Sequence, residues 1–478
     1  MLFNSYGFIF IFLPLCFLVY FSLSQRTPIW LSKAFLVCAS LVFYGFWNPS
    51  YLPLIIISVL SNYFLAQQMI FFDKDQQFLL SKVNLLRLGL IFNVALLCYF
   101  KYMDFFIENT NMLLGTEFSL LKLTLPLAIS FFTLQQIAFL VDSYEGLVKE
   151  SHLLDYSIFV TFFPQLIAGP IVHHKEMMPQ FNDVSKRVKN YDHIALGLYI
   201  FSIGLFKKVM IADQFAIWAS AGFDTANSLG FIEAWATSLS YTFQLYFDFS
   251  GYTDMAIGSA YLFNIKLPQN FNSPYKATGM IDFWKRWHIT LTNFITTYIY
   301  TPIIRSYKKL NFHKAMLATV ITFLIAGLWH GASWMFVIFG GLNGVGIAVN
   351  HYWQKKLRKK LRKKLKFKLN KHFAWLITFL YVNLTFIFFR ALNLEAAYKV
   401  LKGMCDVSEL SLTISLPISK TQIAYIVLGF LITLLLRNTQ ELAEQFAVSK
   451  RNLIFTVILL SLSILSLNKI SEFLYFNF

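Results

Sequence analysis

The chain has few charged residues and few cysteines for its length. Only 14% of its 478 residues are charged and 57% are hydrophobic, whereas a soluble domain carries about 25% charged residues. The four cysteines, at positions 16, 38, 98 and 405, lack the paired spacing of a disulfide framework or a zinc module, and we interpret all four as structural. This composition excludes an ordinary soluble protein and predicts an all-α polytopic membrane protein.

Several catalytic motifs are also missing. The sequence has no Gly-x-Ser-x-Gly, no His-Glu-x-x-His, no phosphate-binding loop and no dinucleotide fingerprint. No repeat of roughly 20 to 50 residues is found, which weakens a transporter hypothesis without excluding it. His173, His174 and Glu176 have no third ligand at a metal-like spacing, so we interpret them as solvated residues of an interfacial loop and expect no metal.

Acidic residues are scarce in one basic stretch. The chain has 41 Lys and Arg against 24 Asp and Glu, a formal net charge of +17. Residues 355–371 contain eleven of these basic residues and no acidic one. Such a concentration favours a cytoplasmic topology signal that contacts anionic lipids over a nucleic-acid site. Leucines at a spacing of four in this stretch predict an amphipathic helix on the membrane surface.

Apolar runs separated by polar connectors predict most of the fold. We expect spans at 8–21, 30–47, 52–69, 88–100, 120–141, 194–211, 231–247, 315–329, 334–349, 373–389, 423–436 and 453–467. The first is interpreted as an uncleaved span, and 396–405 as a short surface helix. The whole chain is predicted to be one domain, with a helical wall at 1–150, a catalytic core at 156–350, the basic loop at 351–372 and C-terminal helices at 373–478.

Two stretches cannot be continuous helices. Residues 162–170 place two prolines and a glycine in an apolar run, which predicts a bent or re-entrant segment. Residues 268–275 contain two prolines and two asparagines, one of them Asn270, and predict a structured loop. This loop leads directly to the first of two notable histidines.

The candidate site is organised around His288 and His330. The first lies in Trp284-Lys285-Arg286-Trp287-His288, where a helix from Ile281 would place Trp284 and His288 on one face. The second lies in Gly327-Leu328-Trp329-His330-Gly331, between two apolar runs whose outer flanks are basic. By the positive-inside rule these runs form a hairpin with His330 at its apex, deep in the membrane or near its far face.

Alternative interpretations exist for the residues around the histidines. Trp284 and Trp287 are also typical of interfacial anchors. Residues 246–254 hold two carboxylates, Asp248 and Asp254. These either cap or brace helix ends through internal hydrogen bonds, or orient a histidine or a substrate hydroxyl. Buried imidazoles suit proton abstraction from a hydroxyl that attacks an activated acyl group.

Four motifs resemble the membrane-bound O-acyltransferase family, within it the alginate O-acetylase branch of bacterial polysaccharide acetylases. They are Phe163-Pro164 through Ala168-Gly169-Pro170, then 246–258, 283–288 and 327–332. Some positions depart from that pattern: His173-His174 stands where many members carry arginine, the stretch 300–305 lacks two glycines, and Asn343-Gly344 replaces a frequent His-Gly pair. These departures bear on which acceptor the protein uses more than on its membership of the family.

The resemblance implies a ring of roughly 11 or more transmembrane helices, with re-entrant and interfacial helices, around a central tunnel. His330 matches the hallmark histidine and His288 the second one. We therefore predict His330 and His288 as catalytic residues, and Trp287, Trp329, Trp284, Asp248 and Asn270 as residues that bind substrate.

The leading hypothesis is a multi-pass O-acetyltransferase of the bacterial inner membrane. It would move acetyl from acetyl-CoA, or another cytoplasmic thioester, to a hydroxyl of an extracytoplasmic glycan, directly or through a periplasmic or membrane-anchored partner. No bound cofactor and no nucleic acid are expected. The alternatives are a transporter or flippase of a lipid-linked saccharide, a D-alanyl transferase acting on a cell-wall polymer, and a scaffolding subunit of a secretion complex.

Overall fold

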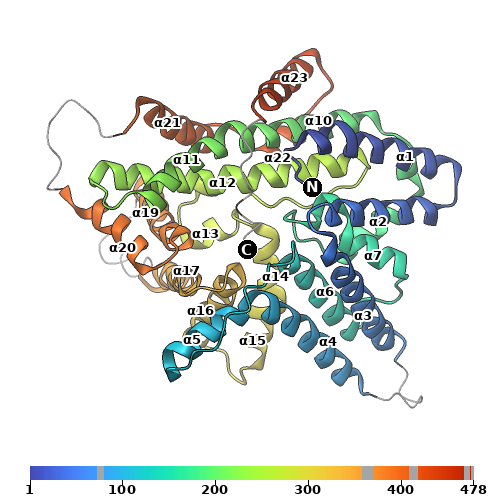
Figure 1. The fold of residues 1–478 in the computed structure, drawn as a ribbon, viewed down its shortest axis with the longest axis horizontal. Helices are drawn as coiled ribbons and strands as arrows, with labels where there is room; N and C mark the ends of the chain where they lie inside the picture. Colours follow the sequence, from blue (N-terminus) through green and yellow to red (C-terminus); the bar gives the residue numbers. More distant parts are fainter. Residues whose placement is uncertain (73–79, 358–369, 408–417, 468–473, 475–478) are drawn as a thin grey trace. The chain divides into compact units, whose positions relative to one another are not determined.

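The computed structural model describes residues 1–72, 80–357, 370–407, 418–467 and 474, and every regular element in those ranges is helical (Figure 1). The chain forms two compact units, which share the long helix α12 (Phe231–Leu262). The predicted amphipathic helix in the basic loop lies outside the described residues, apart from the single turn η9 (Trp353–Leu357).

The first unit comprises Met1–Leu205, Tyr252–Pro268 and Phe446–Phe478. Its helices are η1 (Gly7–Phe12), α1 (Leu13–Arg26), α2 (Ile29–Gly45), η2 (Pro49–Tyr51), α3 (Leu52–Ile70), α4 (Lys82–Leu97), η3 (Cys98–Tyr102), α5 (Met103–Leu114), α6 (Ile129–Tyr144), α7 (Leu153–Thr161), α8 (Phe163–Leu166), α9 (His174–Asn182), η4 (Val184–Arg187), most of α10 (Tyr191–Phe206) and α23 (Lys450–Leu465).

The second unit comprises Phe206–Gly251 and Gln269–Gln445. Its helices are η5 (Lys207–Ala212), α11 (Asp213–Ser220), η6 (Ala221–Thr225), η7 (Pro274–Lys276), α13 (Met280–Trp284), α14 (Ile289–Ile295), η8 (Thr296–Tyr300), α15 (Thr301–Ser306), α16 (Phe312–His330), α17 (Trp334–Tyr352), α19 (Lys371–Arg390), α20 (Leu394–Cys405), α21 (Lys420–Leu435) and α22 (Thr439–Glu444).

Seven helical segments of the described chain are long and apolar enough to cross a membrane. They are Gly7–Arg26, Pro49–Ile70, Lys82–Leu114, Tyr191–Thr225, Phe312–His330, Trp334–Lys355 and Lys371–Arg390. Ile29–Gly45 and Lys420–Leu435 are shorter apolar helices. The prediction of an all-α multi-pass membrane protein is thereby confirmed.

Several predicted spans have different limits in the structure. The runs 88–100 and 194–211 lie within longer helical segments, Lys82–Leu114 and Tyr191–Thr225. The run 120–141 is not one helix, because α6 begins only at Ile129, after Pro126 and after Ala128, whose φ is +62°. The run 231–247 does not end before the polar patch, since α12 continues through it to Leu262. Asp248 and Asp254 therefore lie inside a helix and do not cap its ends.

The helices are interrupted at both proline-containing stretches, as predicted. At 162–170, α7 ends at Thr161, the four-residue helix α8 follows, and turns continue to Pro170. The loop 268–275 has no regular structure before the short turn η7. Both segments are largely buried, so their irregular backbone lies within protein, where such backbone is tolerated at membrane depth.

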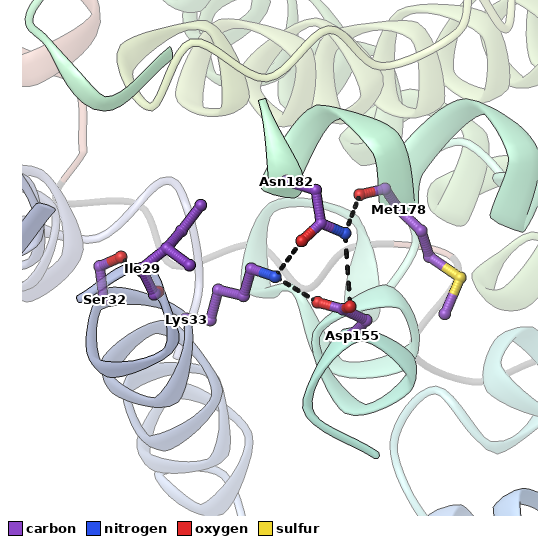
Figure 2. A network of polar contacts seen from close by, with 6 residues as sticks. All are labelled: Ile29, Ser32, Lys33, Asp155, Met178 and Asn182. Carbon is purple, nitrogen blue, oxygen red and sulfur yellow. Dashed lines mark hydrogen bonds and ion pairs between the residues drawn. The ribbon is translucent and has the colours of Figure 1, made fainter. Parts of the chain in front are cut away.

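A buried polar network joins three helices of the first unit. Lys33 of α2 donates to Asp155 of α7 and to Asn182 of α9, each at 2.5 Å (Figure 2). Asn182 in turn donates to the other carboxylate oxygen of Asp155 at 3.3 Å. Because Lys33 and Asp155 are both buried, removing either partner would leave a charge without its counter-ion.

The helices α16 and α17 form the hairpin that the sequence predicts, and they lie side by side (Figure 1). Glycines allow this close approach. A β-carbon on Gly340 would lie 2.3 Å from the carbonyl oxygen of Phe323, and one on Gly327 would lie 2.3 Å from that of Phe336. The helix backbones thus touch directly, as small residues permit in lipid.

We predict that Gly340→Ala destabilises the protein, because its methyl group forces α16 and α17 apart. Overpacking of this kind costs about 1–3 kcal/mol, which should lower the thermal unfolding midpoint of the detergent-purified protein. Gly341→Ala is the matched control, since its β-carbon would meet only the side chain of Leu324 at 3.5 Å. Equal midpoints for the two variants would contradict direct backbone packing at Gly340.

Candidate active site

His288 lies at a break between two short helices. The helix predicted to run from Ile281 past His288 is wrong: α13 ends at Trp284, and His288 has φ +44° and ψ +53°. A positive φ is uncommon for a non-glycine residue and needs support from its surroundings. The loop 268–275 gives that support, because Ile289 N donates to Asn270 O and Asn272 N donates to Arg286 O, both at 2.9 Å.

The side chain of Asn270 determines which nitrogen of His288 carries the proton. Its Oδ1 atom lies 3.0 Å from His288 Nδ1, and it also accepts from the backbone N–H of Thr290 at 3.3 Å and the Thr290 hydroxyl at 2.9 Å. The backbone N–H is always a donor, so Oδ1 is an acceptor and His288 Nδ1 must donate to it. The lone pair of His288 therefore lies on Nε2.

This Nε2 atom has an unsatisfied hydrogen-bonding capacity among the described residues. His288 is fully buried, and Nε2 has no hydrogen-bond partner among the described residues. Burial lowers the pKa of His288 to about 3, so its imidazole is neutral near pH 7. A neutral imidazole with a bare, buried lone pair is a specific acceptor for an O–H or N–H group.

His330 is the last residue of α16 and is also buried. Its ring contacts those of Trp329, Phe389 and Phe339, at centroid distances of 5.0, 5.1 and 6.1 Å. Trp329 also lies 6.3 Å from the ring of His288. The two histidines therefore pack around the same indole, within the second unit.

The three site tryptophans belong to the protein interior. Trp284, Trp287 and Trp329 are all buried. Trp284 Nε1 donates to Asn343 Oδ1 of α17 at 3.2 Å, and Trp287 stacks on Phe283 at 5.6 Å. The alternative that Trp284 and Trp287 are interfacial anchors is therefore wrong.

Asp248 belongs to a buried ion-pair cluster. Its carboxylate lies 2.6 Å from Lys208 Nζ, which also lies 2.8 Å from Asp213. The next residue on α12, Phe249, packs edge-on against His288 at 4.8 Å. Asp248 thus helps to fix the part of α12 that packs against His288, which is an indirect contribution to the site.

Some contributing residues were not identified from the sequence. Phe249 and Phe389 contact the two histidines, and Thr290 bonds to Asn270, but nothing in their local sequence marks them. Asn343 was noted only as a departure from a family pattern. A single amide in an apolar helix does signal a buried hydrogen-bond partner, and here that partner is Trp284.

His173 and His174 lie in the first unit, beside Asp142.

Comparisons with known proteins identify the family of the chain. The profile of the membrane-bound O-acyltransferase family matches residues 41–395, a range that contains both histidines. The chain is 50% identical to a peptidoglycan O-acetyltransferase of Helicobacter pylori, over 86% of this chain and 81% of that protein. It is 34% identical to a probable alginate O-acetylase of Azotobacter vinelandii, over 90% and 84% of the two chains.

A more distant similarity covers about half of the chain. A teichoic acid D-alanyltransferase of Streptococcus thermophilus is 26% identical over 48% of this chain and 58% of that protein. The family profile and the two longer matches each cover well over half of the sequence. The chain therefore belongs to the membrane-bound O-acyltransferase family, and it is a multi-pass O-acyltransferase.

Proposed function

We propose that the protein transfers an acetyl group from a cytoplasmic thioester, such as acetyl-CoA, to hydroxyls of an extracytoplasmic polysaccharide, directly or through a periplasmic partner. The relatives named for O-acetylation of peptidoglycan and alginate support this acyl group and this acceptor class. The observation that carries the site assignment is the buried, unpartnered Nε2 of His288 beside the Trp329-His330 pair.

The two histidines are suited to different tasks. In acyl transfer the hydroxyl oxygen attacks the thioester carbonyl, its proton passes to a base, and the thiolate leaves and takes up a proton. His330 lies at the C-terminal end of α16, where the helix dipole favours the positive charge that a base acquires. We assign His330 as the general base or acyl relay.

His288 is assigned as the partner of His330. Its lowered pKa makes it a weak base, but its fixed tautomer makes it a well-oriented hydrogen-bond acceptor. In this arrangement Nε2 accepts a hydrogen bond from the attacking hydroxyl and holds it in line with His330. Trp287, Trp329 and Trp284 would shape the substrate passage, and Asn270 acts through His288.

The proposed fold around this site is a ring of roughly 11 or more transmembrane helices with a central tunnel, in the bacterial inner membrane. Basic flanks before α16 and after α17 favour a cytoplasmic location for both ends of this hairpin, which places His330 toward the opposite face. Residues 156–350 would form the catalytic core of a single domain, with the wall, basic loop and C-terminal helices arranged around it.

A D-alanyl transferase is the second candidate within the family. The similarity to teichoic acid D-alanyltransferases supports it, but that similarity covers about half of the chain at 26% identity. The transporter and scaffold hypotheses do not account for the family match. The acyl donor distinguishes the two transferases, because D-alanyl transfer would need D-alanine as an activated ester on a carrier.

We expect His330→Ala to reduce acyl transfer by about 10²–10⁴-fold, the usual contribution of a general acid or base. We expect His288→Ala to reduce it by about 10²-fold, because the hydroxyl loses the acceptor that positions it. The measurement is the transfer of label from radioactive acetyl-CoA in membrane vesicles supplied with the periplasmic fraction. His313→Ala is the control, because His313 is exposed near the start of the same helix as His330. Normal transfer by folded His330→Ala and His288→Ala proteins would overturn the site assignment.

We also expect Asn270→Ala to lower kcat by about tenfold or more, with a smaller effect on KM, because His288 loses the acceptor that fixes its tautomer. Asn272→Ala is the control: its side chain lies in the same loop but bonds to Asn438. A larger loss of activity in Asn272→Ala than in Asn270→Ala would argue against tautomer control.

The pH profile tests the same contact. In the wild type, burial lowers the pKa of His288 to about 3, so protonation of His288 should not reduce activity between about pH 5 and 8. Asn270→Asp places a carboxylate beside the imidazole, which favours the protonated ring and raises its pKa. Activity of this variant should therefore fall at a higher pH than that of the wild type, whereas identical acid limbs would contradict the assignment.

A further inference from the structure

Three potential metal ligands come together in the first unit, although they are far apart in the sequence. Asp142 lies in the last turn of α6, His173 is the N-cap of α9 and His174 is its first residue. Their ligand atoms all lie within 4.8 Å of one another. The expectation that no metal is bound relied on a missing third ligand, and the fold supplies one in Asp142.

We propose that Asp142, His173 and His174 form a site for a divalent transition-metal ion of the zinc class. Asp142 Oδ2 lies 2.7 Å from His173 Nε2 and 3.3 Å from His174 Nδ1. Zinc binds nitrogen and oxygen ligands at about 2.0–2.2 Å, so tetrahedral ligands lie about 3.3 Å apart. Small side-chain rotations would bring the three atoms to that spacing.

The donor set selects the class of metal. Two imidazole nitrogens and one carboxylate oxygen suit zinc and its neighbours in the transition series, whereas calcium and magnesium prefer oxygen ligands alone. Three protein ligands leave at least one position for water or another ligand. The residues that follow along α9, Lys175 and Glu176, are exposed and are not part of the set.

The surroundings are favourable for a cation and give it a route of entry. Asp142 lies near the C-terminal end of α6, where the helix dipole adds to the negative potential of the carboxylate. The side chains of Asp142 and His174 are only 4% and 7% exposed, but that of His173 is 31% exposed. Phe139 packs edge-on against His174 at 5.5 Å and closes the site on its apolar side.

Metal binding would change the hydrogen bonds of both histidines at the start of α9. Without metal, His173 Nδ1 accepts from the backbone N–H of Lys175 at 3.3 Å, so the His173 proton lies on Nε2 and is donated to Asp142. Coordination through Nε2 requires this proton to move to Nδ1, which breaks the long capping bond. His174 Nδ1 lies 3.3 Å from the Asp142 carboxylate and donates to it without metal, so its proton must likewise move to Nε2 when Nδ1 binds the ion. The bound ion would therefore replace this capping bond and link the end of α6 to the start of α9.

The test is direct metal binding by the full-length protein, purified in detergent with an affinity tag that contains no histidine and stripped with a chelator. Titration with Co²⁺ should give about one ion per chain, with visible absorption bands that Zn²⁺ abolishes. Zn²⁺ should also raise the thermal unfolding midpoint of the wild type, because a ligand that binds only the folded state stabilises it.

Matched variants locate the ion. Asp142→Asn and His174→Gln should each weaken Co²⁺ binding at least tenfold. His152→Gln, which alters an exposed histidine of the same unit, should bind like the wild type. His288→Ala should also keep full binding, so the outcome does not depend on the proposed function. Absence of Co²⁺ and Zn²⁺ binding by the wild type at micromolar metal, or undiminished binding by both Asp142→Asn and His174→Gln, would overturn the site.

Discussion

The side-chain oxygen of Asn270 accepts three hydrogen bonds, and the backbone around His288 depends on them. The donors are the imidazole Nδ1–H, the backbone N–H of Thr290 and the Thr290 hydroxyl. Together with the two backbone bonds between the loop and the turn, they hold His288 in its left-handed conformation. The buried lone pair on Nε2, the contact with Phe249 and the approach to Trp329 all follow from this conformation.

Much of the helical frame was predictable because lipid imposes a simple rule on sequence. A spanning helix must be apolar along about 20 residues. The sequence therefore predicts the two apolar runs at 315–329 and 334–349 and the turn between them. The two histidines could be selected as candidate site residues for the converse reason, since a polar side chain beside such a run is costly unless it has a partner or a task. The family motifs then suggested which task.

The errors share a different physical cause. Lys285 to His288 were predicted to be helical because their spacing allows it. The hydrogen bonds to Asn270 and the burial of Trp287 outweigh local helix propensity. Similarly, Asp142 could not be connected to His173 from spacing, because their proximity arises only when α6 packs beside the start of α9. Contacts between distant segments determine such positions, and a single sequence does not display them.

The aromatic rings around His330 have a consequence for how the energy of the thioester is used. Phe389, Phe339 and Trp329 pack against this imidazole and present apolar surface to it. An activated acyl group held beside such a surface is protected from hydrolysis until a hydroxyl acceptor arrives. Under the proposed function, each thioester consumed would then yield one modified hydroxyl.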